Sequence, residues 1–298
     1  MRRAQGSTSH HEMAARIAAL DPITEAATVY RLTTLFDFPF ELRFGLNLAF
    51  YRTFAIPSIA AVLAESGQIG QHPRKRAYDT GLFMYELIES GGFDTRTARD
   101  VVSGLNRAHR HWEISNEDFL YVLAAFVVVP ARWINQFGWR QLTGNELTAM
   151  AAFYTELGTR MGIRNIPETY QAFADLLDEY ERAHLAPSFS GISHMSATNG
   201  IIAGRLPRPL RRLAPLLTSA VTDDRICRSL GIKPANALAK NLAKFLLRVR
   251  GVIVRRMPAR KTSWFVPGTR AGSVYPRGYT IADLGPAERP QSSESSGR

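Results

Sequence analysis

The strongest constraint on the fold is a single apolar run, FLYVLAAFVVVPARWI, at residues 119–134. A helix that crosses a bilayer needs roughly 20 apolar residues, and this run is shorter and contains Pro130. Ser115 and Asp118 stand where a helix of this kind would carry its N-terminal cap. We therefore predict a helix that is buried in the core of the protein and does not span a membrane.

Helix start signals recur along the rest of the chain. Thr143 and Glu146, three residues apart, have the spacing of a capping box at the start of a helix. Residues 165–185 read NIPETYQAFADLLDEYERAHL, with Pro167 in the expected first turn and apolar residues at helical spacing. No series of alternating β-branched runs is present, so we expect no sizeable sheet. The predicted fold class is all-α, a single multi-helix globular domain.

The two ends of the chain differ from its middle in composition. Residues 1–20 begin with arginines but lack the apolar h-region of a signal peptide, so we expect a flexible lead into the first helix. Residues 21–270 form the predicted helical domain. Residues 271–298 are rich in Pro, Gly and Ser and form a tail whose end should be disordered. A single cysteine, Cys227, excludes an intramolecular disulfide, and the chain as a whole is typical of a cytoplasmic protein.

The positive charge of the chain is concentrated in residues 205–261. This segment carries fifteen Lys and Arg against only Asp223 and Asp224, whereas the net charge of the whole chain is +11. Such a segment indicates either an anionic partner or a solvated face of helical arginines. Within it, RVRGVIVRRMPARK mixes aliphatic residues with arginines, a composition that suits peripheral contact with an anionic membrane. Recognition-helix signals and interleaved aromatic residues are scarce, so we expect no nucleic-acid partner.

Residues 94–112, DTRTARDVVSGLNRAHRHW, predict an amphipathic helix with a histidine in its apolar stripe. At about 100° per residue, His109 lies on the same side as Leu105 and Trp112, whereas His111 lies at the edge of the stripe. Such a histidine is often a core residue bonded to a backbone carbonyl, and it can also be a general base or a metal ligand. The two histidines lie on different faces and HExxH is absent, which does not favour zinc, but a haem needs only one axial histidine.

A second polar pair precedes this helix. Arg76 and Thr80 are four residues apart, hence on one helix face, and lead into the apolar residues Phe83, Met84 and Leu87. An arginine and a hydroxyl in this arrangement could bind a haem propionate or orient dioxygen. The alternative is a surface arginine followed by a threonine that caps a helix.

Residues 31–185 resemble the family that contains the MpaB-type oxygenases of mycophenolic-acid biosynthesis and, more distantly, the catalytic domain of latex-clearing (rubber) oxygenases. The likeness is carried by RKRAYDTGLFMYELIESGGFD, GLNRAHRHWEISNEDFLYVL, FGWRQLT-x-x-E and LGTRMGIRNIPETYQAFADLLDEYE. Proteins of this family are all-α. Its rubber-cleaving members hold a b-type haem by one proximal histidine, with an arginine and a threonine one helical turn apart nearby.

The resemblance implies that the domain encloses an apolar haem pocket. It implies haem b as cofactor, with His109 as the axial ligand of the iron, His111 as a less suitable one, and Arg76 and Thr80 as residues of the catalytic and haem-binding site. It also implies oxidative cleavage of a carbon–carbon double bond in a small hydrophobic, isoprenoid- or lipid-like substrate. One departure is Asp79, which replaces a lysine that can occupy the distal haem side in some latex-clearing enzymes and so implies an open or water-ligated distal side.

Two alternatives remain at this level. A helical lipid- or partner-binding protein could have kept the fold and lost the chemistry. The aromatic residues near the two motifs could line a substrate tunnel or be ordinary core. These aromatic residues are Phe83, Tyr85, Phe119, Tyr121, Phe126, Trp133 and Trp139.

Overall fold

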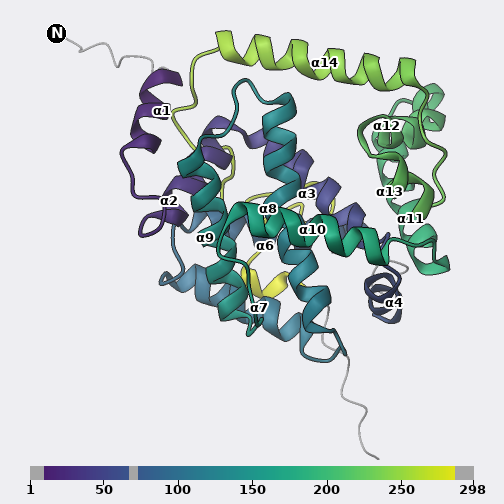
Figure 1. Ribbon diagram of the computed structural model, residues 1–298, viewed down its shortest axis with the longest axis horizontal. Helices are drawn as coiled ribbons and strands as arrows, with labels where there is room; N and C mark the ends of the chain where they lie inside the picture. Colours follow the sequence, from purple (N-terminus) through teal and green to yellow (C-terminus); the bar gives the residue numbers. More distant parts are fainter. Residues whose placement is uncertain (1–9, 67–72, 286–298) are drawn as a thin grey trace, which may run out of the picture.

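The computed structural model describes residues 10–66 and 73–285 as an assembly of helices (Figure 1). Within these residues no strand is present beyond two isolated bridges, which confirms the all-α prediction. Most of the helices share one large hydrophobic core and form a single domain, as predicted. The helices are α1 (His10–Ala18), α2 (Ala26–Arg31), α3 (Pro39–Thr53), α4 (Pro57–Glu65), α6 (Pro73–Glu89), α7 (Arg96–His109), α8 (Asn116–Phe137), α9 (Gly144–Arg160), α10 (Tyr170–His184), α11 (Phe189–Arg205), α12 (Ala214–Val221), α13 (Asp224–Ser229) and α14 (Ala237–Arg256), with a π-helical turn η1 (Leu32–Asp37) and the 3-10 turns η2 (Arg208–Leu213) and η3 (Ile281–Asp283).

Helix α8 forms the centre of the core. Its N-cap is Ser115, whose hydroxyl accepts a hydrogen bond from the backbone N–H of Asp118, as predicted. It packs against α3, α9 and α10, and most of its side chains are buried. Gly45 of α3 lies so close that a Cβ atom there would come within 2.4 Å of the Cα atom of Pro130. The apolar run at residues 119–134 is therefore a core helix, as predicted.

The capping signals place α9 correctly and α10 approximately. Thr143 and Glu146 form the complete capping box of α9. Helix α10 begins at Tyr170, capped by the hydroxyl of Thr169, and not around Pro167 as predicted. The reason is that the carbonyl of Pro167 binds the Thr155 hydroxyl of α9, which holds this residue in the loop.

The structure differs from the sequence expectation near the N-terminus. Residues 10–18, placed in a flexible lead, form the helix α1. Met13 and Ile17, four residues apart, are buried against Val29 and Leu32 in a small core of their own. This spacing puts both side chains on one helix face, so burying that face orders the segment. Residues 1–9 lie outside the described residues.

The structure also differs at the other end. Residues 264–285, which we call the C-terminal segment, run back over the core and bury Phe265, Tyr275, Tyr279 and Leu284. The part of the predicted tail from residue 271 to residue 285 is thus packed, because its aromatic side chains insert into the core. The predicted disordered end, 286–298, lies outside the described residues.

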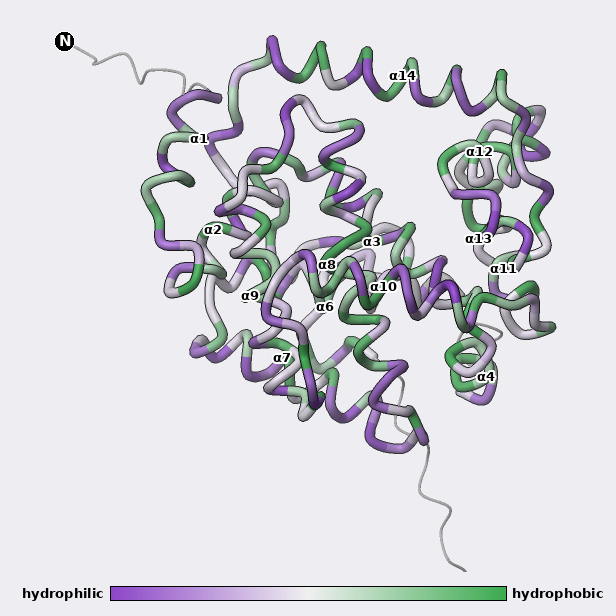
Figure 2. Tube along the Cα trace, viewed as in Figure 1, coloured by the Kyte–Doolittle hydropathy of each residue, from purple (hydrophilic) through white to green (hydrophobic). Residues whose placement is uncertain are grey.

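The basic part of the chain, residues 205–261, includes α12, α13 and α14. Helix α14 runs along the outside of the molecule (Figure 1), and its hydropathy alternates along its length, whereas α8 is apolar through its middle (Figure 2). Taken singly, none of the described helices has both the length and the apolar character of a membrane span; α3 and α4 pass that test only as a pair, bent by 93°.

Candidate functional site

The predicted site residues lie on two neighbouring helices, α6 and α7. These helices pack together and are joined by the short connection 90–95, which makes them antiparallel neighbours. Their contact is close at Gly104, where a Cβ atom would come within 2.9 Å of the ring of Phe83. Because the helices are antiparallel, the first turns of α6 lie beside the last turns of α7. Thr80 and His109 therefore belong to two helices that pack against each other.

His109 is the last residue of α7 and is half-buried, whereas His111 is exposed. Its Nδ1 atom lies 2.7 Å from the carbonyl oxygen of Leu105, one helical turn earlier. A carbonyl only accepts hydrogen bonds, so Nδ1 carries the proton and the lone pair is on Nε2. The ring also lies edge-on to Phe119, with 5.6 Å between the ring centroids. A core histidine bonded to a backbone carbonyl adopts this tautomer, and so does a histidine that binds a metal through Nε2. The exposed His184 makes the same contact with the carbonyl of Tyr180.

Thr80 lies in the middle of α6 and is half-buried. The alternative that Thr80 caps a helix is therefore wrong, because α6 begins seven residues earlier, at Pro73. Arg76 belongs to the same helix, but its side chain lies outside the described residues, so the predicted role of its guanidinium group stays a prediction.

Asp79, the departure from the family pattern, is buried and serves as an anchor. One of its carboxylate oxygens accepts hydrogen bonds from Lys75 (2.6 Å) and the backbone N–H of Gly285 (3.1 Å). The other accepts a hydrogen bond of 2.6 Å from the hydroxyl of Tyr275. Lys75 also donates to the carbonyl oxygens of Gly285 and Asp283. Asp79 thus ties the start of α6 to the C-terminal segment.

Glu86, two turns later on the same helix, repeats this arrangement. It is buried and accepts hydrogen bonds from the hydroxyl of Tyr279 (2.6 Å) and the backbone N–H of Gly268 (3.0 Å). Burial and the hydrogen bond to Glu86 raise the pKa of Tyr279, and burial with the hydrogen bond to Asp79 raises that of Tyr275. Both phenols therefore stay protonated and donate. The sequence analysis missed both contacts, because each joins residues more than 190 positions apart in the chain.

The described residues at this end of the molecule offer one imidazole, that of His109, and not a cluster of metal ligands. Within residues 10–66 and 73–285, no three His, Cys, Asp or Glu side chains are grouped so that they could hold a metal ion. A haem requires one axial imidazole in apolar surroundings. His109 supplies that imidazole in the required tautomer, next to Phe119 and to Leu105, a half-buried residue packed on the core.

The aromatic residues proposed for a tunnel divide into two groups. Four are ordinary core residues, the alternative to a substrate tunnel given above. They are Phe83, Tyr85, Tyr121 and Trp133. Phe119, Phe126 and Trp139 are partly buried and pack against that core. Phe119 also contacts the ring of His109, which places it at the candidate site.

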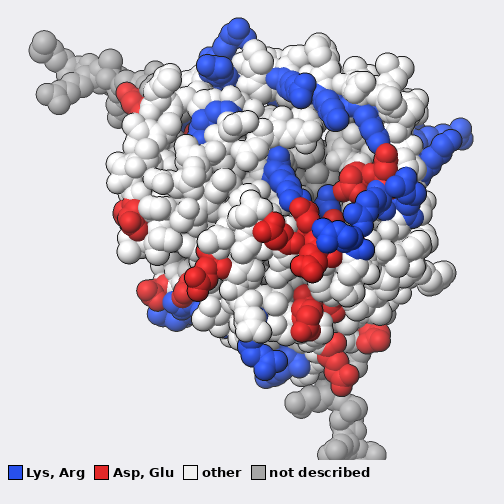
Figure 3. All heavy atoms as spheres, viewed as in Figure 1, with Lys and Arg blue, Asp and Glu red and all other residues white. Residues whose placement is uncertain are grey.

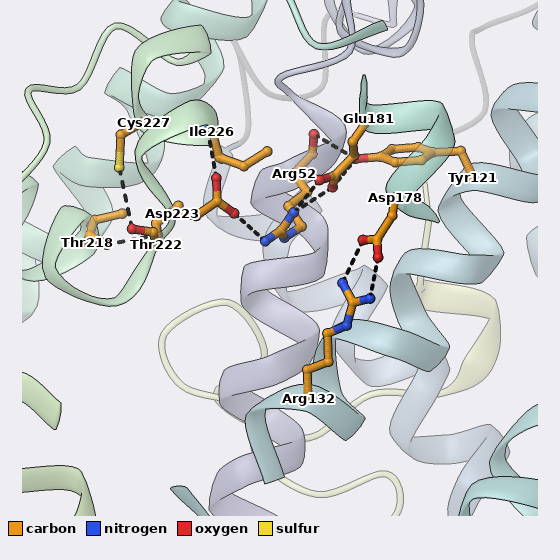
Figure 4. A network of polar contacts seen from close by, with 10 residues as sticks. All are labelled: Arg52, Tyr121, Arg132, Asp178, Glu181, Thr218, Thr222, Asp223, Ile226 and Cys227. Atoms are coloured by element: carbon orange, nitrogen blue, oxygen red, sulfur yellow. Dashed lines mark hydrogen bonds and ion pairs between the residues drawn. The ribbon is translucent and has the colours of Figure 1, made fainter. Parts of the chain in front are cut away.

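A polar network on the other side of the core was missed by the sequence analysis (Figure 4). Arg52 of α3 donates to Glu181 of α10 at 2.6 Å and to Asp223, the N-cap of α13, at 2.5 Å. Tyr121 of α8 donates to Glu181. Burial alone would lower the pKa of Arg52, but the two carboxylates raise it above its usual range, so the guanidinium stays charged. This network joins four helices and is structural.

Comparison with known proteins agrees with the resemblance in the sequence. Residues 37–254 match the model of a family described as "ER-bound oxygenase mpaB/B'/Rubber oxygenase, catalytic domain". The ER-bound oxygenase mpaB' of Penicillium brevicompactum is 24% identical over 88% of this chain and 77% of its own length. The ER-bound oxygenase mpaB of Penicillium roqueforti (strain FM164) is 26% identical over 69% of this chain and 75% of its own. That of P. brevicompactum is 31% identical over 51% of this chain and 40% of its own. The match includes both candidate-site helices and ends before the C-terminal segment.

Proposed function

Because the chain belongs to the oxygenase family of mpaB/B' and rubber oxygenase catalytic domains, we propose that it is a haem b-dependent oxygenase. One observation carries the haem assignment. His109 stands at the end of α7, and its Nδ1–H is held by the Leu105 carbonyl, so that Nε2 is the ring nitrogen that would bind the iron. The haem, when bound, would supply the iron that activates dioxygen.

Each residue of the site has a proposed role. His109 would hold the iron through Nε2. The Leu105 carbonyl fixes the orientation of the imidazole and makes it a stronger ligand. Phe119, edge-on to the ring, limits its rotation and keeps water from that side. Thr80 would donate a hydrogen bond at the site, and Arg76 would pair with a haem propionate.

The substrate we propose is a small apolar molecule of the isoprenoid or lipid type, and the reaction is oxidative cleavage of a carbon–carbon double bond. The family name includes rubber oxygenase, and rubber is a polyisoprenoid with repeated double bonds. Phe119, beside His109, supports an apolar substrate, since it offers no hydrogen-bonding group.

The absorption spectrum of the purified protein tests this proposal. We expect a Soret band after expression in haem-sufficient cells, loss of that band in His109→Ala, and its retention in the matched variant His111→Ala, because His111 is exposed. An unmodified protein without haem would contradict the cofactor assignment. Retention of haem by His109→Ala together with its loss in His111→Ala would contradict the choice of ligand.

A further inference from the structure

Helix α14 exposes an apolar stripe to solvent. The α14 stripe consists of Leu238, Leu242, Phe245, Val249, Val252 and Ile253, whose side chains are between 39% and 77% exposed. At about 100° per residue these six positions fall within roughly 100° of the helix circumference. Soluble proteins seldom leave a continuous apolar row of this kind uncovered, so the stripe marks a contact surface.

The opposite face of α14 is firmly attached to the domain. Gly251 lies against the end of α8, where a Cβ atom would come within 3.2 Å of the carbonyl oxygen of Gly138. Arg250 forms an ion pair with Glu41, which is 2% exposed, and its guanidinium lies over the ring of Phe40. The stripe is therefore exposed because the opposite face of α14 packs against the domain. The helix cannot rotate the stripe inward without breaking these contacts.

The charges beside the stripe are all positive. Lys244, Arg248 and Arg255 are exposed and border one edge of it, and α14 contains no Asp or Glu. Figure 3 shows Lys and Arg side chains following the helix along the upper part of that view. An apolar stripe flanked by cations is the pattern of a helix that lies in the headgroup region of an anionic membrane.

The elements next to α14 also expose apolar side chains. Helix α12 packs against α14, and η2 and α12 expose Leu210, Leu213, Leu216 and Leu217. Arginines of η2 stand among these leucines in the sequence RPLRRL and are exposed as well. The same combination of apolar and basic side chains thus occurs on two adjoining elements.

We propose that α14 docks the protein onto an anionic lipid bilayer. The α14 stripe enters the headgroup region, and Lys244, Arg248 and Arg255 pair with lipid phosphates. An anionic bilayer fits this surface better than a second copy of the chain does. Two α14 helices packed face to face would bring their Lys and Arg side chains together, and α14 has no carboxylate to pair with them. The bilayer also fits better than nucleic acid, which would leave the apolar side chains without a contact. The inference does not depend on haem or on the reaction.

Co-sedimentation with vesicles tests the charged part of this proposal. The full chain is mixed with phosphatidylcholine vesicles that either contain or lack phosphatidylglycerol. We expect binding only to the anionic vesicles, and weakening by high salt. The double variant Lys244→Gln/Arg248→Gln should bind about 30-fold more weakly, since each basic residue near the surface contributes about fivefold. The matched control, Arg96→Gln/Arg99→Gln, neutralises two exposed arginines on α7 and should bind as the unmodified chain does.

A second pair of variants tests the apolar part. Phe245→Ser should weaken vesicle binding by about tenfold because a phenyl ring no longer leaves water. Ile23→Ser removes an apolar side chain that is 61% exposed, against 62% for Phe245, and should have no effect. Circular dichroism confirms that each variant is folded.

Three results would overturn the proposal. The first is a failure of either comparison: the chain binds neutral and anionic vesicles equally, or the α14 variants and their controls weaken vesicle binding equally. The second is an absence of vesicle binding together with a concentration-dependent dimer that Phe245→Ser abolishes, which would identify a second copy as the occupant. The third is preference for DNA over anionic vesicles of the same charge.

Discussion

The interior polar contacts and the outer face of α14 place side chains in opposite environments. In the interior, Asp79 and Glu146 are almost completely buried, and each carboxylate is satisfied by several donors. On α14, large apolar side chains such as Phe245 stand in solvent. A charged side chain is tolerated in the interior only when it has partners, so a buried carboxylate of this kind marks a contact that holds the fold together. A row of exposed apolar side chains stays in contact with water in the folded protein, so it marks a surface that binds another molecule.

Among the interior polar contacts and α14, the largest effect on stability should come from Asp79. Asp79→Ala leaves Lys75 and the hydroxyl of Tyr275 without their carboxylate, and we expect a loss of about 3 kcal/mol in the free energy of unfolding. Chemical denaturation measures this loss, and hydrogen exchange should show faster opening of the C-terminal segment. Asp100→Ala removes an exposed aspartate of α7 and should change stability by less than about 0.5 kcal/mol. Equal losses in both variants would contradict the role of Asp79 as an anchor.

The attachment of α14 should be sensitive to a side chain at Gly251. Gly251→Leu pushes the helix away from the Gly138 carbonyl, and we expect a loss of about 2 kcal/mol, because overpacking displaces the backbone. The matched variant is Gly200→Leu in α11, where a Cβ atom meets nothing within 4 Å. That variant should be neutral or slightly stabilising, since leucine is the better helix former. A neutral Gly251→Leu would show that α14 is only loosely attached.

The contact of Glu146 with Arg140 should make the free energy of unfolding depend on pH. Burial would raise the pKa of Glu146, but the hydrogen bonds and charge of Arg140 lower it from the ordinary value of 4.5. A lowered folded-state pKa means that this group stabilises the protein above pH 4.5 and that the contribution is lost as the pH falls through the folded pKa.

Glu146→Gln removes this contribution, so unfolding curves measured from neutral to acidic pH should show a shallower loss of stability in the variant. Asp37, on the other side of Arg140, has a pKa raised by burial and also by the charge of Glu146, and it contributes the opposite slope. That opposite contribution is smaller in Glu146→Gln, because the charge of Glu146 no longer raises the pKa of Asp37. Neutralising Lys244, which is exposed on α14, should leave the slope unchanged. If Lys244→Gln changed the pH dependence of the free energy of unfolding and Glu146→Gln did not, the role of Glu146 would be contradicted.

Local features of the structure were predictable from the sequence, and long-range contacts were not. The core helix at residues 119–134, the capping box at Thr143 and the inward phase of His109 relative to His111 each depend on neighbours within a few turns. The contact of Asp79 with Tyr275 joins residues 196 positions apart, and no local pattern indicates it. The Pro-, Gly- and Ser-rich composition from residue 271 predicted a tail, and it could not show that Tyr275 and Tyr279 reach buried carboxylates on α6.

The candidate site illustrates the same division. Helical phase distinguished the two histidines on a helix predicted over residues 94–112, whereas α7 ends at His109 and His111 lies beyond it. The family resemblance indicated a haem ligand, but only the structure shows that the Leu105 carbonyl holds Nδ1 and that Phe119 lies against the ring. The composition of residues 205–261 likewise showed apolar residues among the cations of this segment. It could not show that Gly251 and Arg250 fix the inner face and leave the α14 stripe outside.

The smallest effect on stability should come from the α14 stripe. Phe245→Ser exchanges a large apolar side chain for a polar one, yet Phe245 is 62% exposed, so little apolar surface returns to water on unfolding. We expect a change of less than about 0.5 kcal/mol in chemical denaturation, the range of an ordinary surface substitution. Phe173→Ser in α10 makes the same chemical change at a fully buried position and should cost about 4 kcal/mol. If Phe245→Ser were nearly as costly as Phe173→Ser, the stripe would be covered by the chain itself, and the outer face of α14 would belong to the core.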